Sequence, residues 1–300
     1  MLHDDPDLFE QLVLQTSNAL GIAAGIVEKD YYVTVFLKEL QRKRSDIIFK
    51  GGTSLSKCYH LINRFSEDLD LNIECEEHPS ESKRRELKRD IVGSIDALGF
   101  TLENPDDIHS RRDFNRYVIR CPSAPGSGFL KEHLIVETAL SIRSFPSQKM
   151  SAGCFLYDHL HGNGQDDWAQ EHGLTPFDVK VQTAERTFLD KLFALGDYFL
   201  NGTIAEHSRH IYDVYKLSSI IVIDDELKQL AKEVAAQRSV NRMCPSARAD
   251  MGALLQQIID KAVYREDYEN STSKLLFETV EYQTAIAVLP GIIRSGLFQF

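Results

Sequence analysis

Two aspartates in this 300-residue sequence, Asp68 and Asp70, have the type and spacing that metal-dependent chemistry requires. They alternate with Leu69, Leu71 and Ile73, which is the period of a β-strand, so both carboxylates point to one face, roughly 7 Å apart at Cα. Carboxylates placed in this way can jointly bind divalent cations, and oxygen ligands favour Mg²⁺ or Mn²⁺. The alternative is that the two aspartates form the solvent-exposed side of an edge strand.

A glycine turn lies upstream of the aspartates, in the sequence GGTSLSK at residues 51–57. It follows a short apolar run at residues 47–49, which predicts a buried strand that enters a tight turn. Apolar residues at positions 55, 58, 59 and 62 then predict a helix that begins near Ser54. The glycines allow backbone N–H groups to approach a phosphate, and the helix N-terminus adds its positive dipole end. A phosphate site one helix away from a metal-binding pair is the minimum equipment for phosphoryl or nucleotidyl transfer.

Together, GGTSLSK at residues 51–57 and RFSEDLD at residues 64–70 resemble the catalytic motif of the polymerase-β-like nucleotidyltransferases. Within that superfamily the longer string is similar to the AbiEii/AbiGii toxin family. The resemblance implies an α/β (α+β) fold, in which a nucleotidyltransferase lobe with a mixed sheet is followed by a helical second lobe. It also implies that Asp68 and Asp70 bind two Mg²⁺ ions. The nucleotide-binding residues that it implies in this region are Gly51, Gly52, Thr53, Ser54 and Lys57.

A third carboxylate, Glu137, lies in the middle of the apolar stretch at residues 134–140, which predicts a strand. A charge inside such a strand is costly unless it is paired or bound to a metal. In the related superfamily a third acid on a neighbouring strand completes the metal site, and Glu137 is the residue that corresponds, although relatives have aspartate there. The alternative is an edge-strand glutamate that faces water.

Farther along the chain, TFLDKL at residues 187–192, followed by Arg209 and Asp213, also resembles the toxin family. In that family a lysine and an aspartate of the second lobe line the nucleotide site. The resemblance therefore implies that Lys191 contacts the triphosphate, and that Asp213 either orients Lys191 or pairs with Arg209. Without the resemblance, Lys191 is a surface lysine on a helix capped by Thr183, and Arg209 and Asp213 form an i, i+4 ion pair.

Three other polar groups receive no catalytic role. His207 and His210 have no third histidine or cysteine at ligand spacing, so we expect a satisfied surface pair rather than a metal site. The string EKDYY at residues 28–32 predicts the surface of a helix. Nine lysines and arginines between residues 83 and 120 form either a solvated helix face followed by a charged strand, or an RNA-binding surface.

The composition is that of a globular protein, with 43% hydrophobic and 26% charged residues. A net charge of −11 argues against indiscriminate nucleic-acid binding. The five cysteines are scattered without a Cys-x-x-Cys pair, which predicts reduced thiols. Because the N-terminus lacks the features of a signal peptide and no apolar run is long enough to span a bilayer, we expect a cytoplasmic enzyme without a membrane partner.

We place a domain boundary near residue 180, after a loop-rich stretch at 145–180. Residues 1–180 are expected to form the catalytic lobe with N-terminal helices, and residues 181–300 a helical lobe that closes the nucleotide cleft. A Pro/Gly/Ser-rich turn between sheet elements is predicted at residues 122–128.

The predicted activity is metal-dependent transfer of an NMP from an NTP to an acceptor hydroxyl, with Asp68, Asp70, Glu137 and Lys191 as catalytic residues. The resemblance implies an RNA acceptor, such as the 3′ end of tRNA, and growth arrest relieved by a separate antitoxin protein. Two alternatives stay open. The first is a nucleotide-sugar-dependent glycosyltransferase, which uses Asp-x-Asp without the preceding glycine turn and helix, and the second is a non-catalytic nucleotide-binding scaffold.

Overall fold

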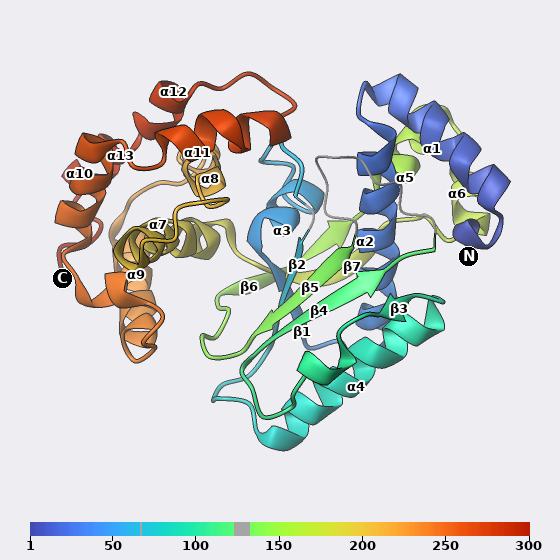
Figure 1. Cartoon of the computed structure of the whole chain (residues 1–300), viewed down its shortest axis with the longest axis horizontal. Coiled ribbons are helices and arrows are strands. Elements are labelled where there is room, and N and C mark those ends of the chain that lie inside the picture. Colours follow the sequence, from blue (N-terminus) through green and yellow to red (C-terminus); the bar gives the residue numbers. More distant parts are fainter. Residues whose placement is uncertain (67, 123–132) are drawn as a thin grey trace. The chain divides into compact units, whose positions relative to one another are not determined.

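The computed structural model describes residues 1–66, 68–122 and 133–300, which form two compact units. Unit 1 consists of Met1–Cys58 and Ser66–Val181, and unit 2 of Tyr59–Phe65 and Gln182–Phe300 (Figure 1). A short segment from the first quarter of the chain therefore belongs to the second unit. Of the turn predicted at residues 122–128, residues 123–128 lie outside the described part of the chain.

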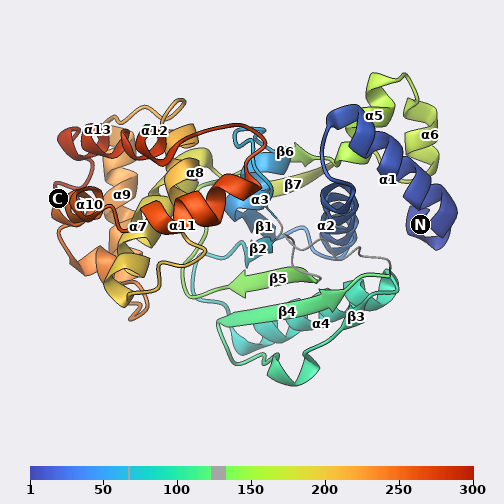
Figure 2. The same ribbon diagram turned by 45° about the horizontal axis from the view of Figure 1, so that its top comes forward.

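Unit 1 is built on a seven-stranded mixed sheet in the order β3-β4-β5-β2-β1-β7-β6 (Figure 2). β2 is antiparallel to β1 and parallel to β5, while β1 is also parallel to β7 and β5 antiparallel to β4. Because β2 and β5 are both internal, the alternatives that placed Asp68, Asp70 and Glu137 on edge strands are wrong. The strands are β1 (Ile47–Lys50), β2 (Asp68–Ile73), β3 (Thr101–Leu102), β4 (Phe114–Arg120), β5 (Leu134–Ala139), β6 (Ser147–Ala152) and β7 (Phe177–Gln182).

The centre of the sheet follows the predicted pattern. Ile47, Ile48 and Phe49 of β1 are buried. Leu69 and Leu71 of β2 are fully enclosed, while the two aspartates that alternate with them are partly exposed. Alternation along β2 therefore places apolar side chains on one face and carboxylates on the other. The mixed α/β fold and the mixed sheet are confirmed.

The helices of unit 1 pack on the sheet and on one another. α2 contacts α1, α4, α5 and β5, and α1, α5 and α6 gather together (Figure 2). As a result α2 is buried on nearly all sides, and the residues of the string at 28–32 lie inside the unit, so their prediction as a helix surface is wrong. The helices are α1 (Pro6–Leu20), α2 (Ala24–Lys43), α3 (Gly51–Lys57), α4 (Glu81–Ala97), α5 (Phe155–Gly162) and α6 (Asp166–Glu171), with 3₁₀ turns at Leu2–Asp4 and Pro105–Asp107.

Two local predictions in unit 1 need correction. The stretch at 145–180 is not mainly loop, because it contains β6, α5, α6 and β7, short elements that lie between the breakers seen in the sequence. The helix after the glycine turn begins at Gly51 rather than near Ser54, and it ends at Lys57. The apolar residues after Cys58 therefore extend no helix; the chain there passes into unit 2.

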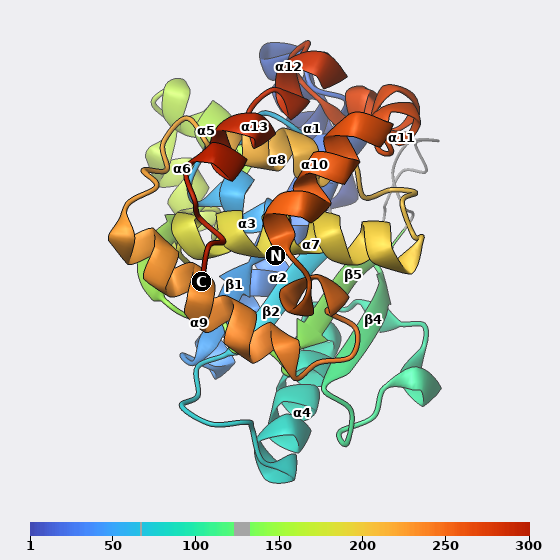
Figure 3. The same ribbon diagram turned by 90° about the vertical axis from the view of Figure 1, so that its left-hand side faces the viewer.

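Unit 2 is helical, and α7 contacts α8, α9 and α10 (Figure 3). Thr183 caps α7 as predicted, because its side chain accepts a hydrogen bond from the N–H of Arg186. The predicted stripe of α7 is buried from Phe188 to Leu195, whereas Leu200 near the end is 46% exposed. The helices are α7 (Ala184–Asn201), α8 (Arg209–Leu217), α9 (Asp225–Ser239), α10 (Met251–Lys261), α11 (Arg265–Asn270), α12 (Tyr282–Ile286) and α13 (Leu289–Arg294), with 3₁₀ turns at Pro245–Arg248 and Thr272–Leu275.

The segment Tyr59–Phe65 is held in unit 2 by backbone hydrogen bonds. The N–H of Phe65 donates to the carbonyl of Leu275 at 2.9 Å, and the carbonyl of Asn63 accepts from the N–H of Phe277 at 2.9 Å. The N–H of Asn63 also donates to the hydroxyl of Tyr212 on α8 at 3.0 Å. These bonds fix the backbone that leads on towards Asp68.

Candidate active site

A row of four charged residues crosses the middle of the sheet in unit 1. Asp70 of β2 is in register with Glu137 of β5 on one side and with Lys50 of β1 on the other, and Glu137 is in register with Arg116 of β4. Residues paired in this way on adjacent strands share a face, and such strands lie about 4.8 Å apart. The structure therefore brings together Asp70 and Glu137, which are 67 positions apart in the sequence, and Asp68 lies on the same face two residues before Asp70.

Across the row the charges run positive, negative, negative, positive. Arg116 Nε lies 3.7 Å from Glu137 Oε1 in a half-exposed ion pair. The two adjacent carboxylates raise the local negative potential, which favours a cation between them. The arrangement is that of an acidic site on a sheet face, flanked by a basic residue on each side.

Gly51 lies directly against the carboxylate of Asp70. A Cβ atom at position 51 would be 2.0 Å from Asp70 Oδ2, and the backbone there has φ of +78°, which L side chains rarely adopt. The change of direction from β1 to α3 thus takes place at a single residue, and the absence of a side chain leaves room for the carboxylate. Glycine is required at position 51 for both reasons.

We expect Gly51→Ala to lower both stability and activity. The left-handed backbone costs an alanine about 1–2 kcal/mol, and the new methyl group would displace the carboxylate of Asp70. Gly21→Ala is the matched control, because Gly21 also has positive φ, +66°, but has no atom within 4 Å of the position that a Cβ would occupy. Chemical denaturation and transfer assays should show that both variants lose stability and that Gly51→Ala alone also loses transfer. Equal activity in the two variants would contradict the role of this contact.

The hydroxyl groups of Thr53 and Ser54 form hydrogen bonds within unit 1. Thr53 Oγ1 donates to the carbonyl of Asp68 at 2.5 Å and lies 3.0 Å from Ser66 Oγ, while Ser54 Oγ donates to the carbonyl of Gly51 at 2.8 Å. The bond from Thr53 ties α3 to the start of β2, whereas the bond from Ser54 stays within α3. The predicted phosphate contacts at Gly52, Thr53 and Ser54 are therefore best supplied by backbone N–H groups, because the first N–H groups of a helix have no acceptor within it.

Lys57 ends α3, and its ammonium group is buried. It donates to Thr34 Oγ1 at 2.7 Å and to the carbonyls of Asp30 and Gly153 at 3.2 and 3.3 Å, and it forms an ion pair with the carboxylate of Asp30. The other carboxylate oxygen of Asp30 accepts from the N–H of Phe155 at 2.9 Å. These contacts join α3 to α2 and to the start of α5. Phosphate binding by Lys57 stays a prediction, and the contacts described here are structural.

The carboxylates of the row fit Mg²⁺ in their chemistry. Within residues 1–66, 68–122 and 133–300, however, no three Asp, Glu, His or Cys side chains are gathered closely enough to hold a metal ion. Mg²⁺ is commonly bound through one or two carboxylates together with substrate phosphates and water, rather than in an all-protein cage. Binding of Mg²⁺ by Asp68, Asp70 and Glu137 together with a nucleotide stays a prediction.

Unit 2 contains a second charged cluster, and it is fully buried. Arg64 donates from Nε and Nη2 to the two carboxylate oxygens of Asp213, at 2.7 and 2.8 Å, and Lys191 Nζ lies 3.1 Å from Asp213 Oδ2. Although burial raises the pKa of Asp213, the charges of Arg64 and Lys191 lower it to about 2. Lys191 is thus a buried residue rather than a surface lysine, and Asp213 holds both Lys191 and Arg64.

Arg64 was not among the predicted site residues. Its position inside RFSEDLD at residues 64–70, immediately upstream of the acidic pair, was the available signal. Its partner Asp213 lies 149 positions away, so the pairing could not be read from local spacing.

The two histidines of the second cluster are not a surface pair. His210 is buried, with Nδ1 3.2 Å from Lys191 Nζ, and the ring of His207 stacks on Tyr198 with centroids 3.5 Å apart. Burial and the neighbouring Arg209 lower the pKa of His207 to about 4, and burial together with Lys191 keeps the pKa of His210 well below 6.5. Both imidazoles are therefore neutral at physiological pH.

These depressed pKa values predict a loss of stability in acid. The unfolded chain binds a proton at each histidine near pH 6.5, whereas the folded protein does so only at lower pH. The contribution of the two neutral histidines to the free energy of unfolding is therefore complete above pH 6.5. It decreases as the pH drops towards the pKa values of the folded state. We expect the denaturant concentration at the unfolding midpoint, followed by circular dichroism, to decrease as the pH is lowered from about 7.5 to about 5. His207→Phe, which keeps a ring beside Tyr198, should reduce this dependence; an unchanged dependence would contradict the assignment.

The basic stretch at residues 83–120 is largely neutralised within unit 1. Arg84 lies 2.8 Å from Asp113, and Arg120 lies 3.0 Å from Glu103. Within the described part of the chain, a carboxylate partner is also present for Arg85, Arg89, Arg111 and Arg116. This pairing favours the interpretation as a solvated face rather than an RNA-binding surface.

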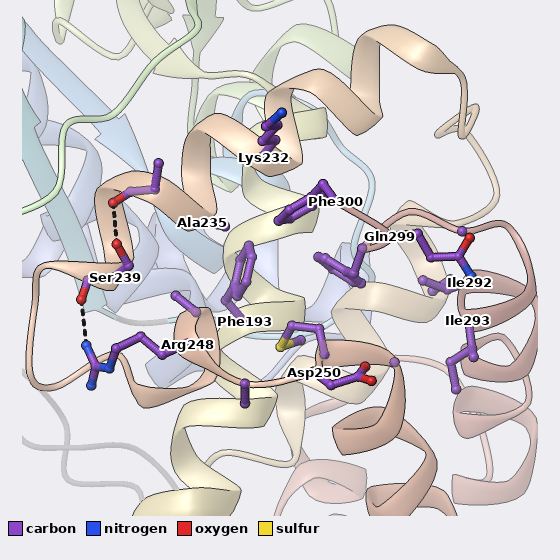
Figure 4. A pocket seen from close by; sticks show the side chains of 17 residues that line it. Phe193, Lys232, Ala235, Ser239, Arg248, Asp250, Ile292, Ile293, Gln299 and Phe300 are labelled. Carbon is purple, nitrogen blue, oxygen red and sulfur yellow. Dashed lines mark hydrogen bonds between the residues drawn. The ribbon is translucent and has the colours of Figure 1, made fainter.

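A separate pocket of about 710 Å³ lies within unit 2 (Figure 4). Its wall consists of aliphatic side chains together with the aromatic rings of Phe193, Phe298 and Phe300. Lys232 and Arg248 also contribute to the wall. The guanidinium of Arg248 donates to the carbonyl of Ser239 at 2.6 Å, as Figure 4 shows. The lining is partly apolar and partly polar, and it includes the carboxylate of Asp250. It does not present the paired carboxylates on which the predicted chemistry depends.

The acidic site beside a glycine at the start of a helix, and the buried lysine–aspartate cluster, contain the residues on which the resemblance to nucleotidyltransferases rests. A family model described as "Nucleotidyl transferase AbiEii toxin, Type IV TA system" matches residues 35–288. The match covers most of the chain and parts of both units, so the chain belongs to the AbiEii family, the nucleotidyltransferase toxins of type IV toxin–antitoxin systems. Membership implies an antitoxin partner. A search of curated proteins gave no match.

The predicted family is thereby confirmed. In the described part of the chain, no helix is both long and apolar enough to cross a membrane.

Proposed function

We propose that this protein transfers an NMP from an NTP to an acceptor hydroxyl, and that the acceptor is an RNA. The observation that carries the proposal is the register of β2 and β5, which pairs Asp70 with Glu137 on one face beside Gly51. Membership of a nucleotidyltransferase family supports the reaction class. The proposal excludes a glycosyltransferase, whose Asp-x-Asp motif does not follow a glycine turn and helix.

Asp68, Asp70 and Glu137 would hold the divalent cation, Mg²⁺ or Mn²⁺. When bound, the cation would neutralise triphosphate charge and make the acceptor hydroxyl more acidic. The backbone N–H groups at the start of α3, from Gly51 to Ser54, bind the β- and γ-phosphates.

The acceptor oxygen attacks the α-phosphorus, the bond from that phosphorus to the bridging oxygen breaks, and pyrophosphate leaves. Glu137 accepts the proton of the hydroxyl. Lys191 offsets the charge of the leaving pyrophosphate, and Asp213 orients the lysine. These roles make Asp70 and Lys191 the residues whose substitution should affect transfer most.

The RNA acceptor, with the 3′ end of tRNA as the first candidate, rests on the family resemblance. Modification of such an RNA in the cytoplasm would stop translation and growth, and the antitoxin would relieve the arrest. Because the net charge is −11 and the basic stretch of unit 1 is internally paired, we expect RNA affinity to be weak.

The test is to incubate the purified protein with total RNA, Mg²⁺ and each α-labelled NTP in turn. We expect one size class of RNA to gain label from a preferred NTP, and a chelator to abolish labelling. Parallel reactions with labelled UDP-sugars test the glycosyltransferase alternative. Tight binding of NTP without transfer to any acceptor would instead support a non-catalytic scaffold.

A further inference from the structure

His210 is a polar contact of Lys191 that the proposed mechanism does not use. Its Nδ1 atom lies 3.2 Å from Lys191 Nζ, close to the distance of 3.1 Å between Nζ and Asp213 Oδ2. His210 and Asp213 lie three positions apart on α8, which places them on one side of the helix. The ammonium of Lys191 therefore lies over two consecutive turns of α8, with one acceptor from each.

The contact between Lys191 and His210 determines which atom is the donor and which tautomer the histidine adopts. An ammonium group only donates hydrogen bonds, so Nδ1 of His210 must be the acceptor and the ring proton must be on Nε2. We infer that His210 is a positioning residue for nucleotidyl transfer, whose imidazole accepts a hydrogen bond from Lys191 and fixes the direction of the ammonium group. This inference rests on the proposed role of Lys191.

Asp213 alone would orient the lysine poorly. Its Oδ2 atom, which contacts Lys191, also accepts from Arg64 Nη2 at 2.8 Å, so this oxygen is shared by two cations. An acceptor oxygen that is shared with a second cation restrains the direction of the ammonium group less than one that serves the ammonium group alone. The lone pair of His210 Nδ1 provides a second acceptor, which restrains the direction of the ammonium group.

The surroundings of His210 suit this role. The residue is buried, and burial with the neighbouring Lys191 and Arg209 charges keeps its pKa well below 6.5, so the ring stays neutral. Its ring lies nearly parallel to that of Tyr198, at 17° and a centroid distance of 5.7 Å. Neutrality preserves the lone pair, and packing against the tyrosine fixes the plane in which it points.

The experiment compares His210→Phe, His210→Asn and wild type in the RNA-labelling assay, each with and without Lys191→Met. His210→Phe keeps an aromatic ring but has no acceptor, so we expect kcat to fall by about ten- to hundredfold with a smaller change in KM for the NTP. His210→Asn places a carbonyl oxygen near the position of Nδ1 and should restore most of kcat. In the Lys191→Met background neither change should have a further effect.

Thermal melts establish which variants are folded, and His210→Ala replaces His210→Phe if the latter does not fold. An equal fall in kcat in both lysine backgrounds would overturn the inference, because the histidine would then act independently of Lys191. Wild-type kcat in a folded His210→Phe would overturn it as well. If Lys191→Met itself transfers at the wild-type rate, the role of Lys191 in the proposed function fails instead, so the two failures are distinguishable.

Discussion

Replacement of Asp70 by asparagine is expected to abolish transfer while it leaves the fold intact. The side chain is partly exposed on the polar face of β2, and asparagine has nearly the same shape, so the contact with Gly51 can persist. The change removes one of the two adjacent carboxylates from the charged row. Because stabilisation of charge at such a site is worth several kcal/mol, we expect the rate to fall by about a thousandfold or more.

Asp178→Asn is the matched control for this variant. Asp178 lies on β7 of the same sheet, is exposed, and pairs with Lys149 at 2.9 Å. The control should transfer at the wild-type rate, and all three proteins should have the same melting temperature. Full transfer by Asp70→Asn would remove the acidic site of unit 1 from the mechanism.

Replacement of Asp213 by asparagine should have the largest effect on stability. Asp213 is fully buried and is the shared counter-charge of Arg64 and Lys191, so the substitution leaves two buried cations without it. Removal of one partner from a buried ion pair costs about 3–5 kcal/mol, which is a large share of a typical free energy of unfolding. Denaturant titration at neutral pH measures this loss.

Two further variants separate charge from packing at this position. Asp225→Asn makes the same substitution at an exposed residue of α9 that pairs with Lys228 at 3.8 Å, and it should unfold with the wild type. Arg64→Met combined with Asp213→Asn removes one of the two cations that lose Asp213 as their counter-charge. The double variant should recover part of the lost free energy of unfolding. An Asp213→Asn protein as stable as the wild type would show that the cluster contributes little to unit 2.

The centre of unit 1 could be predicted because its signals are local. Alternation around Asp68 and Asp70, the apolar run before Gly51, and the charge of Glu137 within an apolar strand each lie within a few residues. The family resemblance identified the same residues. Their register across β2 and β5 required the fold, because spacing along the chain does not determine which strands are neighbours.

The rest depended on contacts between distant segments. The string at residues 28–32 has the composition of a helix surface, but α2 is enclosed by other elements, and Asp30 is paired with Lys57. His210 likewise looked exposed by type, although α8 turns it towards Lys191. In both cases a polar residue is buried because a partner of complementary chemistry comes from elsewhere in the chain, which periodicity cannot reveal.

The membership of Tyr59–Phe65 in unit 2 has a consequence for the gene. The polypeptide passes from one unit to the other three times, after Cys58, after Phe65 and after Val181. A frameshift or stop codon near position 181 would therefore not release an autonomous catalytic fragment. It would leave Arg64 without Asp213, and the segment ahead of the acidic pair without its hydrogen bonds to Leu275 and Tyr212. We expect alleles truncated in this way to be harmless to the cell, because the segment Tyr59–Phe65 would lack its partners in the rest of unit 2.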